Sequence, residues 1–178
     1  MTELQKVARR VVVVEDDNMT RLILTEYLEK AGFEVQSANS ASTAESICAF
    51  FDPDAVVLDV DLGIGPSGLD LADSLLLSSP GIAIVFLTHL PDSRFSGRSS
   101  QSLPTDIAYL NKNKLVDGKS LIEAIESVLH GKKGTIPRDD IDPNRPLAQL
   151  SQNQIEVLRM IALGLDNQQI ATARKTSI

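Results

Sequence analysis

Carboxylates follow two apolar segments that each have the character of a buried strand. A run of four valines ends at Glu15, Asp16 and Asp17, and a second apolar run ends at Asp59. Buried carboxylates need a partner, because desolvating an isolated charge is costly. The carboxyl ends of neighbouring parallel strands converge on one crevice, and clustered carboxylate oxygens are typical ligands of Mg²⁺. If the two strands are neighbours, the sequence predicts a magnesium site at their ends.

Two further strand ends carry groups that suit a tetrahedral anion. Thr88 ends the fourth apolar run and Lys112 follows the fifth, with Tyr109 three residues earlier and Asp61 two residues after Asp59. A hydroxyl and an ammonium can both donate hydrogen bonds to phosphoryl oxygens. A carboxylate beside a metal ion and such donors can act as the nucleophile that accepts a phosphoryl group. We therefore expect phosphoryl-transfer chemistry at Asp59.

Alternating strands and helices must position these groups. Apolar periodicity predicts strands at 10–15, 33–38, 55–58, 82–88 and 107–110, and helices at 18–31, 41–51, 69–77 and 121–129. Asn18 and Ser40 are the expected caps of the first two helices. The polar segment 92–103 predicts a fourth helix that is short, shifted or mobile. Five βα units with apolar strands indicate an α/β fold with a five-stranded parallel sheet covered on both faces.

Charge divides the 178 residues into two parts. Residues 1–131 carry 10 Lys and Arg against 19 Asp and Glu, a net charge of −9, whereas residues 132–178 carry 7 against 5, a net charge of +2. This asymmetry favours two modules. The single Cys48 excludes an intrachain disulfide and is expected in the core. The sequence has neither an apolar stretch of transmembrane length nor a signal peptide, so we expect a cytoplasmic protein without a membrane partner.

The C-terminal part begins with a segment rich in Gly, Pro and charged residues, 132–149, which predicts a linker that resists packing. Two short helices are expected after it. Each opens with a capping-box pattern, Ser151 with Gln154 and Asp166 with Gln169, and Gly164 separates them. Two short helices joined by a tight turn are typical of the start of a helix-turn-helix.

In the order and spacing of these motifs, residues 8–131 resemble the receiver domain of two-component response regulators, which has a flavodoxin-like (βα)₅ fold. The resemblance implies that Asp59 is the phospho-acceptor, that Glu15 and Asp16 are the acidic pair, and that Lys112 is the lysine of the site. It also implies that Thr88 and Tyr109 are switch residues.

The same resemblance implies a cofactor and a partner. Mg²⁺ would be held by Glu15 and Asp16, by the carboxylate of Asp59, and by the backbone carbonyl of Asp61. A sensor histidine kinase or a phosphotransfer protein would supply the phosphoryl group. Phosphorylation would draw Thr88 toward the phosphate and let Tyr109 turn inward, and homodimerisation is a possible consequence.

Residues 150–178 resemble the first half of a LuxR-type helix-turn-helix domain. The resemblance rests on Leu150, Ser151, the Glu156-Val-Leu158 run, and the later pattern Asn167-x-x-Ile170-Ala171. The recognition helix, which normally reads bases in the major groove, would begin where this sequence stops. We therefore expect a longer parent protein to bind DNA and to regulate transcription, and this chain to bind DNA weakly or not at all.

The receiver pattern departs from the family in two places. Gly63 stands where a proline is usual, and the loop from Gly63 to Gly68 is expected to be longer and more flexible. His89 follows Thr88, where a small residue is usual, so that an imidazole could restrict access to the phosphate or contact it.

Two other functions remain open. The pair Asp59 and Asp61 resembles the Asp-x-Asp motif of haloacid-dehalogenase phosphatases, although that motif ends the first strand in those enzymes. A module that dimerises independently of phosphorylation would also keep these acids. The preferred interpretation is a switch and not a turnover enzyme.

Overall fold

The computed structural model describes residues 7–96, 103–131 and 135–175. Its centre is a five-stranded parallel sheet in the order β2-β1-β3-β4-β5, which confirms the predicted fold class. The strands are β1 (Arg10–Val14), β2 (Glu34–Ala38), β3 (Ala55–Leu58), β4 (Ala83–Thr88) and β5 (Ala108–Asn111). The helices that accompany the sheet are α1 (Asn18–Lys30), α2 (Ala41–Phe51), α3 (Gly68–Ser78) and α4 (Lys119–Leu129).

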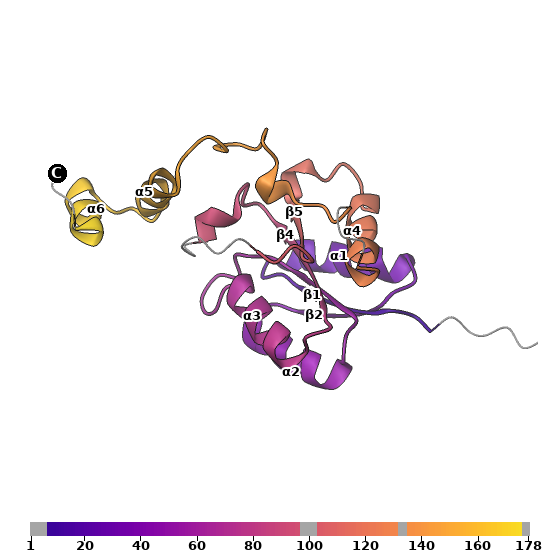
Figure 1. Cartoon of the computed structure of the whole chain (residues 1–178). Helices are drawn as coiled ribbons and strands as arrows, with labels where there is room; N and C mark the ends of the chain where they lie inside the picture. The colour runs from indigo at the N-terminus through magenta and orange to yellow at the C-terminus, as the bar shows by residue number, and fades with distance from the viewer. Residues whose placement is uncertain (1–6, 97–102, 132–134, 176–178) are drawn as a thin grey trace, which may run out of the picture.

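Helices cover both faces of the sheet (Figure 1). Side chains alternate along each strand, so Val12 and Val14 face one layer while Val11 and Val13 face the other. The first layer packs against α2 and α3, and the second packs against α1 and α4. Every residue of β3 and β4 is buried, as expected for strands with helices on both sides. This burial fixes the strand ends where the polar groups lie.

The predicted boundaries differ from the observed ones in small respects. Asp17, and not Asn18, is the N-cap of α1, because its side chain accepts a hydrogen bond from the Thr20 N–H. Ser40 is the N-cap of α2, as predicted, and its side chain accepts a hydrogen bond from the Thr43 N–H. Both acceptors do the same job of satisfying an amide in the first turn. As the N-cap of α1, Asp17 adds a further carboxylate beside the strand ends.

The β4–β5 connection carries the short 3₁₀ helix η1 (Ser93–Ser96) in its described part. The sequence predicts a short, shifted or mobile fourth helix over 92–103, and η1 is the helical turn that the described part of this segment contains. Residues 97–102 lie outside the described part of the chain. In the described part of the connection, η1 contacts the C-terminal helix that begins at Gln152.

The segment after α4 packs against the receiver, although its composition predicts a linker that resists packing. A parallel bridge joins Tyr109 of β5 to Arg138, and the Asn111 N–H donates to the Asp139 carboxylate at 2.8 Å. The 3₁₀ helix η3 (Asp139–Ile141) follows. The prediction made from composition was wrong for this segment, because its charged side chains form contacts with the sheet domain, as Asp139 does with Asn111.

Two short helices complete the described chain, α5 (Gln152–Ala162) and α6 (Asn167–Arg174). Both begin with the predicted capping boxes, Ser151 with Gln154 and Asp166 with Gln169. Figure 1 shows this pair at the side of the receiver, reached by the extended segment that follows η3. Among the described helices, none has the length and apolar character needed to cross a membrane.

Candidate functional site

Three carboxylates gather at the carboxyl ends of β1 and β3. The register pairs Val14 with Leu58, so that Glu15 and Asp59 leave the two neighbouring strands at the same level. Carboxylate oxygens of Glu15, Asp16 and Asp59 all lie within 4.8 Å of one another. Glu15 and Asp59 are buried whereas Asp16 is exposed. This is a set of hard oxygen donors with one open side, which fits a magnesium ion that keeps part of its water shell.

Lys112, in the 3₁₀ helix η2 (Lys112–Lys114), supplies a cation to this cluster. Its Nζ donates to Asp59 Oδ2 at 2.6 Å and to Glu15 Oε2 at 2.5 Å. Burial alone would lower the pKa of Lys112, but the hydrogen bonds to Asp59 and Glu15 outweigh it and raise that pKa. The ammonium therefore stays charged and holds Asp59 in a fixed orientation.

The packing around Glu15 raises the pKa of its carboxyl. Burial is the largest influence and raises the pKa of Glu15, with the nearby Asp59 acting in the same direction. The hydrogen bond from Lys112 opposes this rise without cancelling it. Because the pKa of Glu15 is raised, a second positive charge at the site would stabilise its ionised form.

The loop after β3 is held close to the cluster by backbone hydrogen bonds. The Asp61 N–H donates to Asp59 Oδ1 at 3.2 Å, and the Gly63 N–H donates to Asp61 Oδ1 at 3.3 Å. Asp61 lines the same cavity, but its side chain is not part of the three-carboxylate cluster. Asp61 therefore lies beside the three-carboxylate cluster. The sequence predicted that only its backbone carbonyl would hold the metal ion.

Gly68 fixes where the loop from Gly63 to Gly68 ends. A Cβ built at Gly68 would lie 1.9 Å from the Asp59 carbonyl oxygen. No side chain can be accommodated at that distance, so only glycine allows α3 to start against the Asp59 backbone. Gly63 has a φ of 71°, in the left-handed region where glycine is favoured. The loop is therefore anchored at both ends.

Thr88 lies at the end of β4, the neighbour of β3, and Tyr109 lies on β5, one strand further from Asp59. Thr88 is buried at the end of β4 and lines the cavity, and its Oγ1 accepts a hydrogen bond from the Leu90 N–H at 3.3 Å. Tyr109 is fully buried, and its hydroxyl donates to the Leu90 carbonyl at 3.0 Å. Burial raises the pKa of Tyr109, so the hydroxyl remains a donor. Leu90 therefore links Thr88 to Tyr109.

These residues surround one cavity of about 460 Å³. Its lining residues are Glu15, Asp16, Asp17, Thr20, Asp59, Asp61, Thr88, His89, Leu90 and Lys112. Of the side chains that are ionised at neutral pH, five are carboxylates and one is an ammonium. The excess of negative charge favours the binding of a divalent cation.

His89 lies at the mouth of this cavity. It is exposed, and its Nδ1 is 3.2 Å from Asn113 Oδ1, which directs the ring toward the β5 side. Asp17 and Thr20 also line the cavity, and sequence reasoning did not single out Thr20 at all. The position of Thr20 could have indicated this, because Thr20 lies in the first turn of the helix that follows the acids, and that turn must start beside the strand end.

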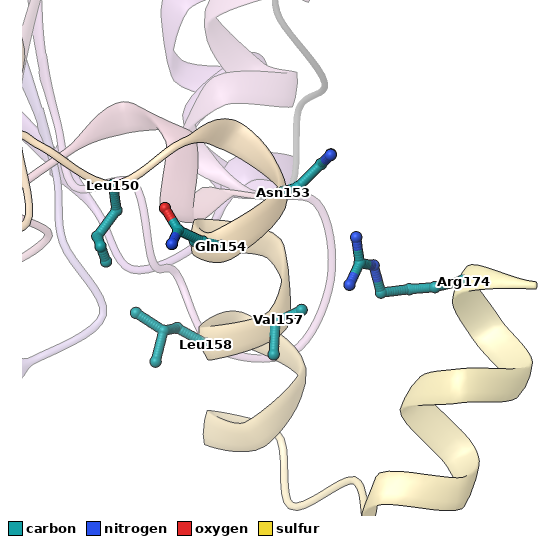
Figure 2. Close-up of a pocket in the computed structure, with 6 residues that line it drawn as sticks. All are labelled: Leu150, Asn153, Gln154, Val157, Leu158 and Arg174. Atoms are coloured by element: carbon teal, nitrogen blue, oxygen red, sulfur yellow. The ribbon is translucent and has the colours of Figure 1, made fainter. Parts of the chain in front are cut away.

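A second hollow lies between the two C-terminal helices (Figure 2). It has a volume of about 430 Å³ and is lined by Leu150, Asn153, Gln154, Val157, Leu158 and Arg174. Figure 2 shows Val157 and Leu158 on α5, with Arg174 reaching across from α6. The two helices thus leave part of their apolar surface uncovered within the described residues.

Residues 11–101 match the response regulator receiver domain family. This match spans half of the chain and includes the acids after β1, the acid after β3 and the Thr88 strand end. Together with the five-stranded parallel sheet and its clustered strand-end acids, it establishes that the chain belongs to this family.

Known proteins resemble the chain at the level of sequence and fold. The nitrate/nitrite response regulator protein homolog of Haemophilus influenzae is 29% identical over 172 residues, which cover 91% of this chain and 79% of that protein. A CheY-like receiver domain protein of Methanospirillum hungatei has a TM-score of 0.58 at 21% identity, over 70% of this chain and 96% of its own. The response regulator TrrA of Thermotoga maritima, solved in complex with Mg²⁺–BeF, has a TM-score of 0.55 at 26% identity, over 67% and 98% of the two chains.

Proposed function

We propose that this protein is a phosphorylation switch in which Asp59 accepts a phosphoryl group from a histidine kinase or a phosphotransfer protein. The observation that carries this proposal is the single ammonium of Lys112, which contacts both Asp59 and Glu15 at the strand ends. A nucleophilic carboxylate must be fixed in orientation and its product charge must be neutralised, and this arrangement does both.

Each residue of the site has a defined part in the proposed transfer. One Asp59 oxygen attacks phosphorus, the bond from phosphorus to the donor atom breaks, and the donor leaves with that electron pair. Lys112 and the Thr88 hydroxyl donate to phosphoryl oxygens. Glu15, Asp16 and Asp59 would hold Mg²⁺, which would supply positive charge beside the transferring group. Its fit is supported by the oxygen-only donor set and by the Mg²⁺–BeF complex of TrrA.

We further propose that α5 and α6 belong to a LuxR-type DNA-binding output that regulates transcription. The two capping boxes and the tight turn at Gly164 support this reading, as does the similarity to a nitrate/nitrite response regulator. Arg174 and Lys175 offer only phosphate contacts, so the 178-residue chain is expected to bind DNA weakly. Tight, sequence-specific binding in a gel shift of this chain would contradict that expectation.

Mass spectrometry tests the phosphoryl transfer directly. The protein is incubated with Mg²⁺ and acetyl phosphate, and Asp59→Asn is treated in parallel. One phosphoryl group that is lost on mild alkaline treatment, and is missing in Asp59→Asn, is the expected result. A label on both proteins would place the acceptor elsewhere.

The same experiment separates the proposed switch from two alternatives. Continuous release of phosphate from a phosphomonoester would favour an aspartyl-phosphate phosphatase, since a switch carries at most one group per chain. Mg²⁺ binding without a label, in a dimer unaffected by Asp59→Asn, would favour a module that works without phosphorylation.

A further inference from the structure

Asp139 bonds to the residue that directly precedes Lys112 in the chain. Its Oδ2 accepts a hydrogen bond from the Asn111 N–H at 2.8 Å. Asn111 is the last residue of β5 and is buried, and β5 is an edge strand of the sheet. A buried backbone N–H at a sheet edge needs an acceptor, because leaving it unpaired is costly. Asp139 supplies that acceptor from outside the sheet.

The second oxygen of Asp139 reaches the other end of the same turn. Asp139 Oδ1 accepts a hydrogen bond from Lys114 Nζ at 3.0 Å, and Lys114 is the last residue of η2. Lys112 is the first residue of η2. One carboxylate therefore holds the turn that carries Lys112 at both of its ends.

The turn η2 has few hydrogen bonds of its own to hold it in place. A 3₁₀ turn has poor hydrogen-bond geometry, and here the Leu115 N–H donates to the Lys112 carbonyl at 3.3 Å. Asn111 is the N-cap of η2, and its Oδ1 accepts a hydrogen bond from the Asn113 N–H at 2.8 Å. The position of η2 thus depends on Asn111, and the Asn111 backbone is in turn bonded to Asp139.

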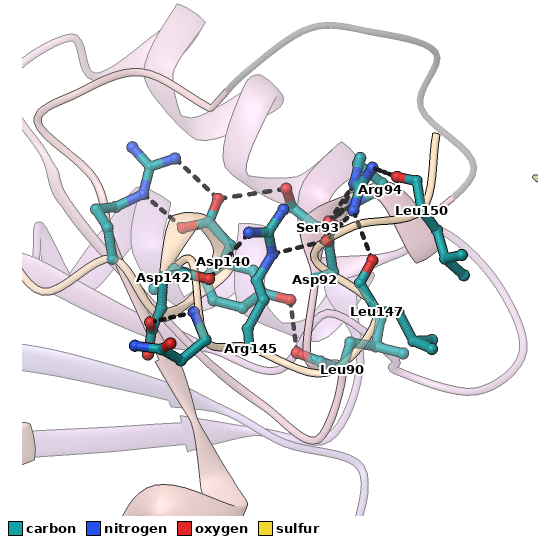
Figure 3. A network of polar contacts seen from close by, with 12 residues as sticks. Leu90, Asp92, Ser93, Arg94, Asp140, Asp142, Arg145, Leu147 and Leu150 are labelled. Atoms are coloured by element: carbon teal, nitrogen blue, oxygen red, sulfur yellow. Dashed lines mark hydrogen bonds and ion pairs between the residues drawn. The ribbon is translucent and has the colours of Figure 1, made fainter. Parts of the chain in front are cut away.

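The segment that carries this carboxylate is itself fixed on the sheet domain. The Tyr109 N–H donates to the Pro137 carbonyl at 2.9 Å, so that the segment runs along the outer edge of β5. The buried Asp140 is paired with Arg138 at 2.7 Å, and it accepts a hydrogen bond from the Ser93 hydroxyl at 3.3 Å (Figure 3). These contacts hold the backbone on both sides of the carboxylate that bonds to β5.

Lys112 must keep its ammonium within hydrogen-bond reach of two carboxylates at once. Its Nζ lies 2.6 Å from Asp59 Oδ2 and 2.5 Å from Glu15 Oε2. The stem of a lysine is flexible, so the place of its ammonium depends on its backbone as well as on its partners. A misplacement of about 1 Å at a reacting centre can cost roughly a hundredfold in rate. A residue that fixes the Lys112 backbone therefore contributes to the reaction without contacting the phosphoryl group.

We propose that Asp139 is a positioning residue for phosphoryl transfer to Asp59, and that it acts through Asn111 on the turn that carries Lys112. The kinetic part of this proposal rests on the proposed function, whereas the fixing of Lys112 rests on the contacts alone. Asp139 lies beyond residues 11–101, which match the receiver family. The segment whose composition predicts a linker thus completes the surroundings of the lysine.

Three variants of the full chain isolate the contact between Asp139 and Asn111. Asp139→Ala removes both contacts of the carboxylate, whereas Asp139→Asn keeps an oxygen that can accept from the Asn111 N–H. Asp142→Ala is the matched control, because Asp142 also pairs with Lys114, at 2.7 Å. The Asp142 side chain bonds to Lys114 and to the Asn144 N–H and not to β5. The two alanine variants therefore share the loss of a Lys114 ion pair and differ in the contact with Asn111.

The rate of phosphoryl labelling by acetyl phosphate and Mg²⁺ is the first measurement. Asp139→Ala is expected to slow labelling by roughly tenfold, because the ammonium is held less well. Asp139→Asn should recover most of the rate, and Asp142→Ala should label as fast as the wild type. An equal loss in the two alanine variants would overturn the proposal, because the loss would then follow from the Lys114 ion pairs. If Asp139→Ala does not fold, Asp139→Ser, which is too short to reach Asn111, takes its place.

A double-mutant cycle tests whether Asp139 acts through Lys112. Removal of Asp139 matters for labelling only while the lysine is present, so Asp139→Ala should change the slow labelling of Lys112→Met by less than about twofold. Equal factors in the wild type and in Lys112→Met would overturn the proposal, because Asp139 would then act independently of the lysine.

A second measurement needs no phosphoryl group. The Lys112 side chain is 10% exposed and bonded to two carboxylates, so acetic anhydride should modify it slowly in the native protein. Asp139→Ala should raise the rate of Lys112 modification, located by mass spectrometry, by at least roughly threefold. Asp142→Ala should leave this rate unchanged, and the exposed Lys30 serves as the internal standard.

The proposed function and the positioning role can fail separately. If the wild type takes no phosphoryl label, the proposed function fails and the kinetic part of the proposal fails with it. The modification of Lys112 then still decides whether Asp139 fixes the lysine, and an unchanged rate in Asp139→Ala would overturn that part as well.

Discussion

The Lys112 ammonium lies 2.6 Å from the Asp59 carboxylate, although 53 residues separate the two in the chain. Both side chains are about nine-tenths buried, with exposures of 10% and 9%. A buried ion pair is only marginally favourable in itself, but removing one partner leaves the other charge uncompensated. In this site the loss of Lys112 affects two carboxylates, because Glu15 shares the same ammonium.

Lys112→Met is therefore expected to destabilise the metal-free protein by about 3–5 kcal/mol in urea unfolding at neutral pH. It is also expected to slow phosphoryl labelling by at least roughly a hundredfold, since a charge that stabilises the transferring group is lost. Lys30→Met serves as the control, because Lys30 forms an exposed pair with Glu26 in α1 and should change stability by less than about 1 kcal/mol. Equal stability of the two variants would contradict the role of Lys112.

We expect magnesium binding at this site to depend on pH through Glu15. Burial raises the pKa of Glu15 above 4.5, and a protonated carboxyl is a poor metal ligand. Magnesium affinity should therefore fall as the pH is lowered from neutrality through this raised pKa. Glu15→Gln should bind Mg²⁺ more weakly at neutral pH and should show a shallower pH dependence, as measured by titration with the metal at several pH values.

The stability of the metal-free protein should respond to Glu15 in the opposite sense. A carboxyl whose pKa is higher in the folded state than in the unfolded chain binds its proton more tightly when folded. Its contribution to stability therefore rises as the pH falls through the folded pKa toward 4.5. Urea unfolding of wild type and Glu15→Gln without Mg²⁺ isolates this contribution, which should be missing in the variant.

Gly68→Ala tests the contact between α3 and the Asp59 backbone. The added Cβ would meet the Asp59 carbonyl oxygen at 1.9 Å, so the backbone must shift and Asp59 must move with it. We expect a loss of about 1–3 kcal/mol in stability together with slower phosphoryl labelling. Gly81→Ala is the control, because nothing lies within 4 Å of its Cβ position, and it should be neutral or slightly stabilising.

Cys48 reports on the packing of α2. Burial raises the pKa of the Cys48 thiol to about 11, with a smaller effect of Glu45. Since the thiolate is the reactive form, iodoacetamide should modify the native protein slowly at neutral pH and the urea-unfolded protein quickly. Rapid modification of the native protein would show that α2 opens more easily than its packing implies.

The sequence predicted the sheet and the gathering of acids because both follow from local patterns. Four valines before Glu15, and an apolar run before Asp59, define strand ends without any knowledge of partners. The topology of parallel sheets then brings those ends together. The sharing of Lys112 between Glu15 and Asp59 is different in kind, because it depends on side-chain positions that spacing does not encode.

Long-range charge pairing could not be predicted from the sequence for the same reason. Asp92 and Arg145 lie 53 residues apart, in segments whose compositions predicted a weak helix and a linker. Charged residues in Pro-rich stretches are usually solvated, so nothing local distinguished Arg145 from an exposed arginine. The capping box at Ser151, by contrast, was correctly predicted because both of its partners lie within one helical turn.

Tyr109→Phe separates the hydroxyl of Tyr109 from its ring. The hydroxyl donates to the Leu90 carbonyl at 3.0 Å, whereas the ring packs in the core with its centroid 6.1 Å from that of Phe86. Phe retains the ring contacts, and the half-buried Leu90 can be partly hydrated, so the expected loss of stability is about 0.5–1.5 kcal/mol. Tyr109→Ala, which also removes the ring, should lose about 3–5 kcal/mol.

The consequence of Tyr109→Phe for the loop should be larger than its consequence for the phosphorylation site. Among the described residues, the Tyr109 hydroxyl is bonded to the Leu90 carbonyl and not to Asp59 or Lys112, so phosphoryl labelling should reach the wild-type extent. The loop from Thr88 to Asp92 loses the bond that ties Leu90 to β5, so its amides should exchange faster. A variant that labels poorly while the loop stays protected would instead place Tyr109 among the residues that orient the phosphoryl group.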